Sequence, residues 1–575
     1  MFINTIPEKK TGKTLIILVE SYRKDGKVKQ RTIETIGYLE DLKGTGPGQF
    51  PDPIAHFRDV AKQRTLEAKA EQATVTLTYR ANEVLPLGTN NVKNVGYMPL
   101  SRIYEELEIE RFILNRQRNL KIKYSLNRVL RTLLFGRILF PDSKKGTFED
   151  AHTFFEKIDF SLDDVYRSLT LLDRYSKDLQ IHLHKQVTEK YGRSTDRVYY
   201  DVTNYSFESE TRTDLRAKGV SKEHRKTPIV QMGLLMDTQG LPIAYQLFPG
   251  NTNDCETLMP MLQTARNDFD VGRFVLVADR GLNSSNNIAM ALAKGDGYVY
   301  GQSILKATNE LKAYCLKPDG YHSYSGTYGD DSFRIKSRIT PRIIQIENAE
   351  GKKVRVTIDE KQVFFYSEKY ARRARAEREE ALEKARQLIA RPALYNQANE
   401  WGVRKYIANL MVDPNTGEIL TPQADLYLNE DRIREEAQYD GYYAVTSSEL
   451  DRADTEIMDL YRGLWKIEES FRLTKSDLEA RPVFVSTDEH VNAHFLTCFI
   501  ALLFTRILEL KTEHRFPLGQ MLEDMRRTNG TLLNDNTYLF GYYTEVLQAI
   551  GDAFEIDFSR KFCNRKEILT WRKRS

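Results

Sequence analysis

Residues 457–475 carry a repeating pattern that limits what this part of the chain can form. Apolar residues recur at steps of three and four, which predicts one face of a helix made of Ile457, Leu460, Leu464, Ile467 and Phe471. A second stripe beside it, also at helical spacing, consists of Tyr461, Trp465, Glu468, Arg472 and Lys475. A carboxylate there can hold a metal ion, and the cations can hold phosphates. For this helix alone, a solvated face with ordinary ion pairs is the simpler interpretation.

Two aspartates upstream favour metal binding. Arg197–Thr203 is a short β-like run that we predict to end in Asp201, and Arg273–Gly281 contains a continuous apolar run, typical of a buried strand, that ends in Asp279. Three carboxylates from two strands and one helix can hold two Mg²⁺ ions about 4 Å apart, and such a pair activates a water or a 3′-hydroxyl for phosphodiester chemistry. We predict that Asp201, Asp279 and Glu468 are the catalytic metal ligands. Mg²⁺ is the expected cofactor, with Mn²⁺ able to replace it.

These residues resemble the motifs of the DDE transposases of bacterial insertion sequences, in the branch whose RNase H-like core carries a large insertion before the last catalytic helix. Asp201 and Asp279 match the two aspartates of that family, the second in its Asp-Arg-Gly form. Ser221–Arg225 and Phe248–Asp254 resemble further landmarks of the family. The resemblance is good over roughly residues 195–510 and weaker in the flanks.

The last catalytic helix of this branch carries a Tyr-Arg-Glu-Lys signature at fixed spacing. The positions that match it are Tyr461, Glu468 and Lys475, together with Trp465. The arginine expected three residues after the tyrosine is Leu464 here. Arg462 stands nearby but projects from a different side of a helix. This departure puts the role of the arginine in question and leaves the assignment of the glutamate intact.

The resemblance implies cut-and-paste DNA transposition, in which the ends of the element are cleaved and joined to target DNA. The implied partners are double-stranded DNA, as terminal repeats and as target, and a second copy of the chain in a homodimer on DNA. Two alternatives remain. One is a two-metal nuclease that cuts without strand transfer. The other is a non-catalytic DNA-binding protein descended from a transposase, which the three intact carboxylates disfavour and Leu464 slightly favours.

Several residues are candidates for contact with DNA. Tyr461, Arg472 and Lys475 are placed to orient the terminal phosphates. Trp465 either packs in the core or offers a surface for a displaced base, and packing is the interpretation we favour. The other candidates are Arg462, Arg280, Lys222, Arg225, Lys226, Lys121, Lys123, Arg128 and Arg131. The alternative for these cations is a solvated loop or a helical scaffold with incidental charges.

Composition adds a modest electrostatic signal. The net charge is only +4, so the chain as a whole does not indicate nucleic-acid binding. Residues 102–146 nevertheless carry eleven Lys and Arg against five acids, and residues 560–575 carry seven against one. A basic face in a near-neutral protein suits a DNA binder with an acidic centre. Solvated helix faces and a frayed tail are the alternative.

Other classes of protein fit less well. The longest apolar run, residues 495–508, contains Thr497, Thr505 and Arg506 and is better interpreted as a buried helix than as a membrane span. The N-terminus lacks a signal-peptide pattern, which predicts a cytoplasmic protein without membrane contact. The resemblance implies a bacterial, nucleoid-associated protein. The four cysteines are widely separated and are expected to be reduced. For His490 and His494 we expect a satisfied structural role or one facing a phosphate.

The pattern of elements predicts an α/β protein. Asp-Gly between the β-rich runs 14–22 and 28–37 predicts a hairpin. After Asp201 we expect strands at 229–236 and 242–248, a helix at 254–269, a strand to Asp279, a helix at 284–294 and a strand at 297–301. Later come β-like runs at 333–344, 354–358 and 362–366 and a charged helix at 367–389. This order is the RNase H-like pattern of a mixed sheet.

The predicted domains follow from these elements. They are an N-terminal β-hairpin region (1–43), a linker and accessory segment (44–97), a mainly helical DNA-binding region (98–192), the first part of an RNase H-like core (195–302), a β-rich insertion (303–438), the second part of the core with the catalytic helix (439–510), and a C-terminal helical region with a basic tail (511–575).

Overall fold

The computed structural model divides into two compact units, Met1–Thr89 and Asn90–Ser575. The residues that it describes are 1–8, 11–24, 27–72, 82, 84–219, 227–269, 271–324, 333–347, 352–390, 403, 405–409, 426–533 and 536–572.

The first unit is a small antiparallel sheet with a helix packed on it. Its elements are β1 (Phe2–Pro7), β2 (Thr14–Lys24), β3 (Lys27–Tyr38), α1 (Leu39–Leu42) and α2 (Pro53–Gln72). The strands lie in the order β1-β2-β3, and β2 and β3 form the hairpin that the Asp-Gly signal predicted. The core of the unit is the apolar middle of β2, Ile16–Val19, with Ala61 of α2 also buried.

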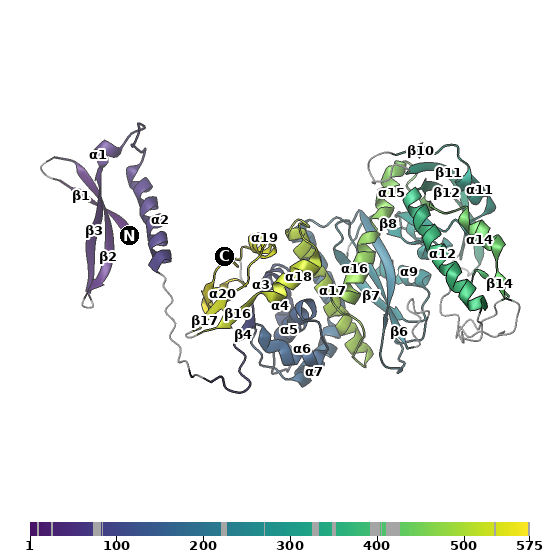
Figure 1. Ribbon diagram of the computed structural model, residues 1–575, viewed down its shortest axis with the longest axis horizontal. Helices are drawn as coiled ribbons and strands as arrows, with labels where there is room; N and C mark the ends of the chain where they lie inside the picture. Colours follow the sequence, from purple (N-terminus) through teal and green to yellow (C-terminus); the bar gives the residue numbers. More distant parts are fainter. Residues whose placement is uncertain are drawn as a thin grey trace. The chain divides into compact units, whose positions relative to one another are not determined.

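The second unit is built around a nine-stranded mixed sheet in the order β10-β11-β12-β15-β9-β8-β5-β6-β7 (Figure 1). The strands β5, β8 and β9 are parallel, and the remaining neighbours are antiparallel. The bounds of the first five strands in chain order are β5 (Arg197–Ser206), β6 (Ile229–Met236), β7 (Pro242–Pro249), β8 (Val275–Ala278) and β9 (Gly297–Gln302). These confirm the predicted strands, except that β5 continues beyond Asp201 because β6 pairs with it as far as Ser206.

The two faces of this sheet are covered by different helices. Side chains alternate between the faces along each strand. Val198 and Tyr200 of β5 pack with the two helices α9 (Asp254–Phe269) and α10 (Ser285–Ala293). Tyr199 and Tyr205 belong to a larger core on the other face, which includes α15 (Asp454–Arg462), α16 (Trp465–Ser476) and α17 (Asp488–Lys511).

Helix α17 joins the sheet to a helical region. It contacts α3, α5 and α7 as well as β7 (Figure 1). Among the described residues, α17 alone is long and apolar enough to cross a membrane, and 94% of its apolar window is buried inside the protein. This confirms the predicted buried helix. The helices of the region are α3 (Met98–Glu106), α4 (Ile109–Gln117), α5 (Leu126–Leu139), α6 (Lys144–Glu149), η1 (Asp150–Thr153), α7 (Leu162–Arg174) and α8 (Ser176–Tyr191).

Between β9 and β15 (Tyr442–Ser447) the chain extends the main sheet. The added elements are α11 (Asn309–Leu316), β10 (His322–Ser323), β11 (Arg334–Glu347), β12 (Lys353–Tyr366), α12 (Glu368–Ala390), β13 (Ile407–Ala408), β14 (Tyr427–Leu428) and α14 (Glu430–Ala437). Two predicted runs are one strand, β12. The charged residues between the two runs suggested a break. Glu360 and Lys361 are nevertheless both buried, because Glu360 pairs with Arg342 (2.6 Å) and Lys361 with Asp454 (2.9 Å).

The end of the chain returns to the start of the second unit. A four-stranded sheet in the order β18-β17-β16-β4 contains β4 (Val92–Asn94), β16 (Asn529–Leu532), β17 (Thr537–Phe540) and β18 (Phe562–Asn564). The buried amide of Asn94 donates hydrogen bonds to the carbonyl oxygens of Met525 (2.9 Å) and Thr528 (3.2 Å), which fixes this closure. The remaining helices are α18 (Leu518–Arg527), α19 (Glu545–Phe554) and α20 (Arg565–Thr570).

Candidate active site

Asp201 lies on β5, and Asp279 directly follows β8, the parallel strand beside it. The pairing of β5 with β8 ends at Tyr200 and Ala278, so the two aspartates are the next residues along each chain. Val275 and Val277 of β8 face the same core as Tyr199. By alternation, Asp279 and Asp201 therefore point to that face. The loss of the β8 partner beyond Tyr200 opens the sheet where both carboxylates emerge.

The predicted single helix 457–475 is two helices with a tight turn between them. Helix α15 ends at Arg462, and α16 begins at Trp465. Around the turn, the amides of Leu464, Lys466 and Ile467 donate to carbonyl oxygens three residues back, which is 3₁₀ geometry. A Cβ on Gly463 would lie 2.1 Å from the hydroxyl oxygen of Tyr199. The glycine is thus required by the close approach of β5.

Contacts on either side of Glu468 place it opposite Asp201. Gly463 lies against Tyr199, and the hydroxyls of Thr474 and Tyr205 are 2.7 Å apart. Five residues of helix from Gly463 to Glu468 rise about 7.5 Å. Two residues of strand from Tyr199 to Asp201 advance about 6.7 Å. Helix α16 thus runs along β5 with Glu468 at the level of Asp201, so all three predicted carboxylates lie on one face of the sheet.

Tyr461 lies beside Asp279. A Cβ on Gly301 would lie 2.5 Å from the Tyr461 hydroxyl oxygen and 3.0 Å from the Arg280 amide nitrogen, so the phenol tip sits between β9 and the turn after β8. Burial raises the pKa of Tyr461 well above its ordinary value, and the negative charge of Asp279 raises it further. Tyr461 is therefore a neutral hydrogen-bond donor at physiological pH.

Two cations of the predicted stripe differ in how they are held. Lys475 donates a 2.8 Å hydrogen bond to the hydroxyl of Thr203, two residues beyond Asp201 on the same face. The side chain of Arg472 is 66% exposed. Its guanidinium nitrogens lie 3.9 Å from the carboxylate of Glu469 and 3.8 Å from that of Asp477. Lys475 is held in place near the carboxylates, whereas Arg472 projects to solvent.

The packing prediction for Trp465 is wrong. Its side chain is 56% exposed, because the turn at Gly463 gives the buried positions to Leu464 and Ile467. The guanidinium of Arg462 stacks over the ring of Phe333, 5.1 Å from its centroid. Leu464 is buried, and Arg462 points toward the added strands.

The three carboxylates supply the oxygen donors that a hard divalent cation prefers. Asp201 and Asp279 each accept a hydrogen bond from the following backbone amide, at 2.7 Å and 2.5 Å. Within the described ranges, no group of three or more His, Cys, Asp or Glu side chains is arranged closely enough to hold a metal ion. The donor set therefore suits a divalent ion in its chemistry, but the three side chains do not form a preformed cage.

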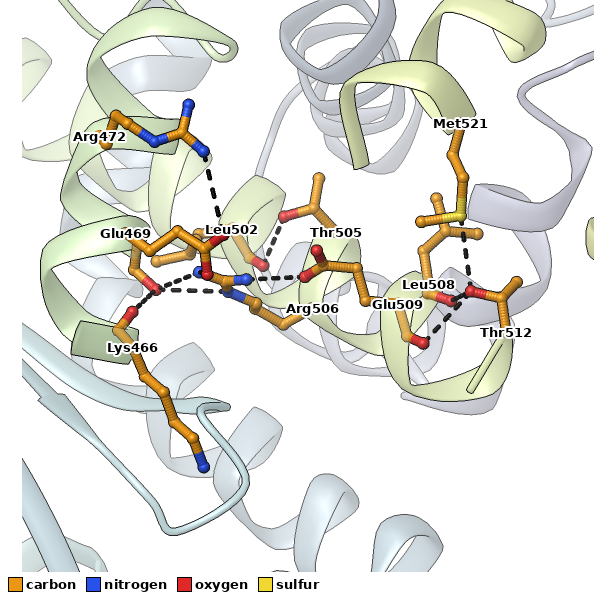
Figure 2. Close-up of polar contacts among 11 residues, drawn as sticks. Lys466, Glu469, Arg472, Leu502, Thr505, Arg506, Leu508, Glu509, Thr512 and Met521 are labelled. Carbon is orange, nitrogen blue, oxygen red and sulfur yellow. Dashed lines mark hydrogen bonds and ion pairs between the residues drawn. The ribbon is translucent and has the colours of Figure 1, made fainter. Parts of the chain in front are cut away.

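A buried arginine fixes α16 to α17. The guanidinium of Arg506 lies between Glu509 (2.8 Å) and Glu469 (3.1 Å), and it also donates to the hydroxyl of Ser470 (2.8 Å) (Figure 2). Glu469 and Ser470 directly follow Glu468. This network holds the middle of α16 and so sets the position of Glu468.

Polar residues that sequence reasoning missed link the added strands to the turn after Asp279. Asn283 donates to the carbonyl of Gly301 (3.0 Å) and accepts from Arg342 of β11 (3.0 Å). Arg342 also binds Glu360 (2.6 Å), which accepts from the buried Tyr298 hydroxyl (2.8 Å). Asn283 lies four residues after Asp279, but no local pattern marks its partners, because they lie far away in the sequence.

The remaining predicted DNA contacts are spread over the chain. Arg280 is exposed beside Asp279, and Lys121 and Lys123 are exposed in the loop between α4 and α5. Arg128 is paired with Asp159. Arg131 is buried and paired with Glu156 at 2.9 Å, which favours a structural role over the predicted phosphate contact. The predicted contacts that lie outside the described residues are Lys222, Arg225 and Lys226.

The basic face predicted for residues 102–146 is smaller than the sequence suggested. Four of its eleven cations are buried, namely Arg102, Arg131, Arg137 and Lys144.

Comparison with known proteins gives two family matches. Residues 201–504 match the model described as "Transposase DDE domain", and residues 3–75 match "IS1634 family transposase, N-terminal domain". A search of curated proteins gives no match. Among solved structures, "Mos1 transposase paired-end complex with left transposon end" is 11% identical, with 44% of this chain and 68% of that chain covered. Its TM-score of 0.14 is too low to indicate a shared fold.

Proposed function

The chain belongs to the family of transposases with a DDE domain, and from this we propose that it cleaves the ends of its own insertion sequence and joins them to target DNA. The observation that carries the proposal is the convergence of Asp201, Asp279 and Glu468 on one face of the sheet, inside the matched region 201–504. The order of the first five strands supports an RNase H-like core, in which β7-β6-β5 are antiparallel and β5-β8-β9 are parallel.

In this proposal the three carboxylates hold two Mg²⁺ ions, for which Mn²⁺ can substitute. The ions would activate the attacking oxygen and neutralise charge at phosphorus. Asp201 and Asp279 are supported as ligands by their adjacent places at the ends of the paired segments of β5 and β8. Glu468 comes from α16, which the Arg506 network ties to α17 and which contacts β5 through Thr474 and Lys475. The binding of DNA completes the arrangement, since phosphate oxygens are additional ligands for such ions.

Other residues at the site bind and orient the DNA strand. Tyr461, kept protonated, donates a hydrogen bond to a phosphate oxygen next to Asp279. Lys475 places a positive charge near the reacting phosphate from its position on Thr203. Arg472 and Arg280 contact phosphates further along the strand. Trp465, exposed on the same helix, stacks against a displaced base.

The remaining parts of the chain are proposed to recognise DNA. The residue 3–75 match supports a transposase-specific role for the first unit, and the helical region 98–192 is proposed to read the terminal repeats. Lys121, Lys123 and Arg128 remain the phosphate contacts proposed there. The segment 303–438 is proposed as the insertion, because its strands extend the sheet between β9 and β15. A homodimer acting in the cytoplasm, at the bacterial nucleoid, would hold two ends together.

The test is end cleavage and joining by the purified full chain, with its own terminal repeats, a target plasmid and Mg²⁺. We compare the wild type with Glu468→Gln and with Glu456→Gln, an exposed acid on α15. The wild type and Glu456→Gln are expected to nick and join. Glu468→Gln is expected to bind the ends and to lose both reactions by a factor of about 10³ or more, as removal of a main electrostatic group does.

Each alternative function gives a distinct result in this assay. A nuclease would cut the ends without producing joined products. A descended DNA-binding protein would bind the ends in all three forms without cutting them. Equal cutting by Glu468→Gln and the wild type would remove Glu468 from the active centre.

A further inference from the structure

A cavity of 290 Å³ lies beyond the end of α16, away from the three carboxylates. Its wall is made by the end of α5, the start of α6, the segment after α16 and the first half of α17. The residues that line it are Arg137, Pro141, Asp142, Ser143, Lys144, Glu479, Arg481, Pro482, Phe484, Val485 and His494. Three cationic side chains therefore face one enclosed space.

Lys144 is a buried cation without a counter-ion in the part of the chain that the structure describes. Its side chain is 5% exposed, and its hydrogen bond goes to Nδ1 of His494 at 3.2 Å. Nε2 of His494 lies 3.0 Å from the carbonyl oxygen of Ala480 and so carries the hydrogen. Burial and the charges of Lys144 and Arg137 hold the pKa of His494 well below its usual value, so the ring is neutral and its Nδ1 accepts from the lysine. A buried ammonium group facing only a neutral imidazole is costly, unless an anion joins it.

Arg137 contributes a second buried cation to the cavity wall. The terminal nitrogens of its guanidinium donate to the carbonyl oxygens of Asp142 (2.7 Å), Glu479 (3.1 Å) and Leu478 (3.2 Å). Its Nε is buried and has no hydrogen-bond partner among the residues that the structure describes. Only 5% of the surface of Arg137 is exposed. A buried N–H without an acceptor is uncommon and again favours an oxygen ligand in the cavity.

The acidic residues of the cavity do not cancel this charge. Asp142 and Glu479 are both solvent-exposed, so water screens their charges, whereas Lys144 and Arg137 are deep in the wall. The inner end of the cavity is thus positive. At its mouth, the ring of Phe484 is 68% exposed and offers an apolar surface for a sugar or base.

We propose that this cavity binds a phosphate group of a DNA strand, with Lys144 and Arg137 as the donors. The inference rests on the proposed function, because that function supplies the DNA. Oxygen-rich, singly charged phosphodiester groups match a buried ammonium and a guanidinium N–H. A free phosphate ion offers the same chemistry, and the experiment below distinguishes the two sources.

The position of the cavity fixes which phosphate it would hold. The amide of Val483, in the cavity-forming segment, donates to the carbonyl oxygen of Ser206 at the end of β5 (3.3 Å). Ser206 is five residues beyond Asp201, a distance of about 17 Å along a strand. Phosphates of one DNA strand are spaced about 3.4 Å along the duplex axis, so a duplex lying along β5 would place the contact roughly five nucleotides from the reacting phosphate.

The test uses the full chain and a duplex of its own terminal repeat, without divalent metal, so that binding is measured apart from cleavage. One phosphate at a time is replaced by a neutral methylphosphonate, and the dissociation constant is measured by fluorescence anisotropy. The variants are Lys144→Met and the control Lys145→Met. Lys145 is the next residue, has 66% of its side chain exposed and pairs with Glu149.

For the wild type and Lys145→Met, we expect one position, roughly five nucleotides from the cleaved bond, where the neutral linkage weakens binding about tenfold. Lys144→Met should bind unmodified DNA about tenfold more weakly than the wild type does. A methylphosphonate at that position should weaken the binding of this variant by less than about twofold further. Lys144→Arg, which keeps the charge, should retain the position-specific loss. The same loss in Lys144→Met and the wild type would overturn the proposal.

Thermal unfolding in inorganic phosphate identifies a free-ion site. If phosphate raises the Tm of the wild type and not of Lys144→Met, while no methylphosphonate position stands out, the DNA assignment is overturned. If the wild type does not bind its own terminal repeat at all, the proposed function itself fails. Binding without position-specific coupling to Lys144 sinks only the inference about the cavity.

Discussion

A buried cation lies near each end of α17, and the two cations differ in whether the protein supplies a negative charge beside them. Near the C-terminal end, Arg506 lies between two carboxylates, Glu509 and Glu469. Near the N-terminal end, His494 faces Lys144 with a neutral ring. The first charge is compensated by the protein itself and fixes α16 beside the active site. The second is left for a ligand to compensate, which is typical of a binding site and not of a scaffold.

The comparison predicts opposite effects on stability when each cation is removed. Arg506→Ala leaves Glu509, also buried, without its partner, so we expect the free energy of unfolding to fall by about 3 kcal/mol or more. Urea denaturation measures this loss. Arg515→Ala, which removes an exposed arginine just after the same helix, should change the value by less than about 0.5 kcal/mol.

The paired change Arg506→Met with Glu509→Met sharpens the first prediction. The double change removes both buried charges, so it should lower the free energy of unfolding clearly less than Arg506→Ala does. A double variant that is as unstable as the single one would show that Arg506 acts through packing and not through its charge.

Removal of Lys144 should stabilise the protein, and the gain should depend on pH. Burial lowers the pKa of Lys144 from 10.5 to about 7, and the nearby charge of Arg137 lowers it further. Between pH 7 and 10.5 the unfolded chain binds more protons at this site, so wild-type stability rises with pH. The advantage of Lys144→Met is largest below pH 7 and shrinks by up to about 1.4 kcal/mol per pH unit above it.

Denaturation of both proteins between pH 7 and 9 measures this difference. Two groups near Lys144, His494 and Cys498, do not titrate there. Burial lowers the pKa of His494 well below its ordinary value and raises that of Cys498, so the first stays neutral and the second protonated. A pH-independent difference would mean that Lys144 is already compensated.

An exposed cation should have the smallest effect on stability. Arg472 has 66% of its side chain exposed and only distant ion pairs, so Arg472→Gln should change the free energy of unfolding by less than about 0.5 kcal/mol. It should, however, reduce the dependence of log Kd on log salt for end DNA by about one, as loss of one phosphate contact does. Arg273→Gln, with 60% exposure and at the opposite end of β8 from Asp279, is the control and should leave the salt dependence unchanged.

Local patterns predicted the sheet well. The apolar runs 229–236 and 242–248 are strands in the structure, and nearly every side chain on them is buried. A continuous apolar run predicts such a buried strand directly. Local patterns failed where residues far away in the sequence determine the local structure. Glu360 looks like a break between two short strands, yet Arg342 and Tyr298 allow it to be buried within one. The turn at Gly463 was missed because the ring of Tyr199, far away in sequence, imposes it.

The same limit applies to the site. The three carboxylates were found because strand ends and helical spacing are local features, and the structure brings them to one face. A charge count over residues 102–146 could not separate exposed lysines from Arg131 and Lys144, which are buried. Nor could helical spacing show that Trp465 is exposed, because the turn at Gly463 changes which residues face the core.

The central claim is that Asp201, Asp279 and Glu468 form one metal centre. The most direct measurement is Mn²⁺ binding to the full chain in complex with end DNA that carries a non-hydrolysable linkage at the cleavage site, followed by electron paramagnetic resonance. We predict saturable binding by the wild type and Glu456→Gln, and at least about tenfold weaker binding by Asp201→Asn, Asp279→Asn and Glu468→Gln, as loss of a charged ligand should cause. Unchanged Mn²⁺ affinity in any of these three variants would contradict the assignment of that carboxylate and the active centre built on it.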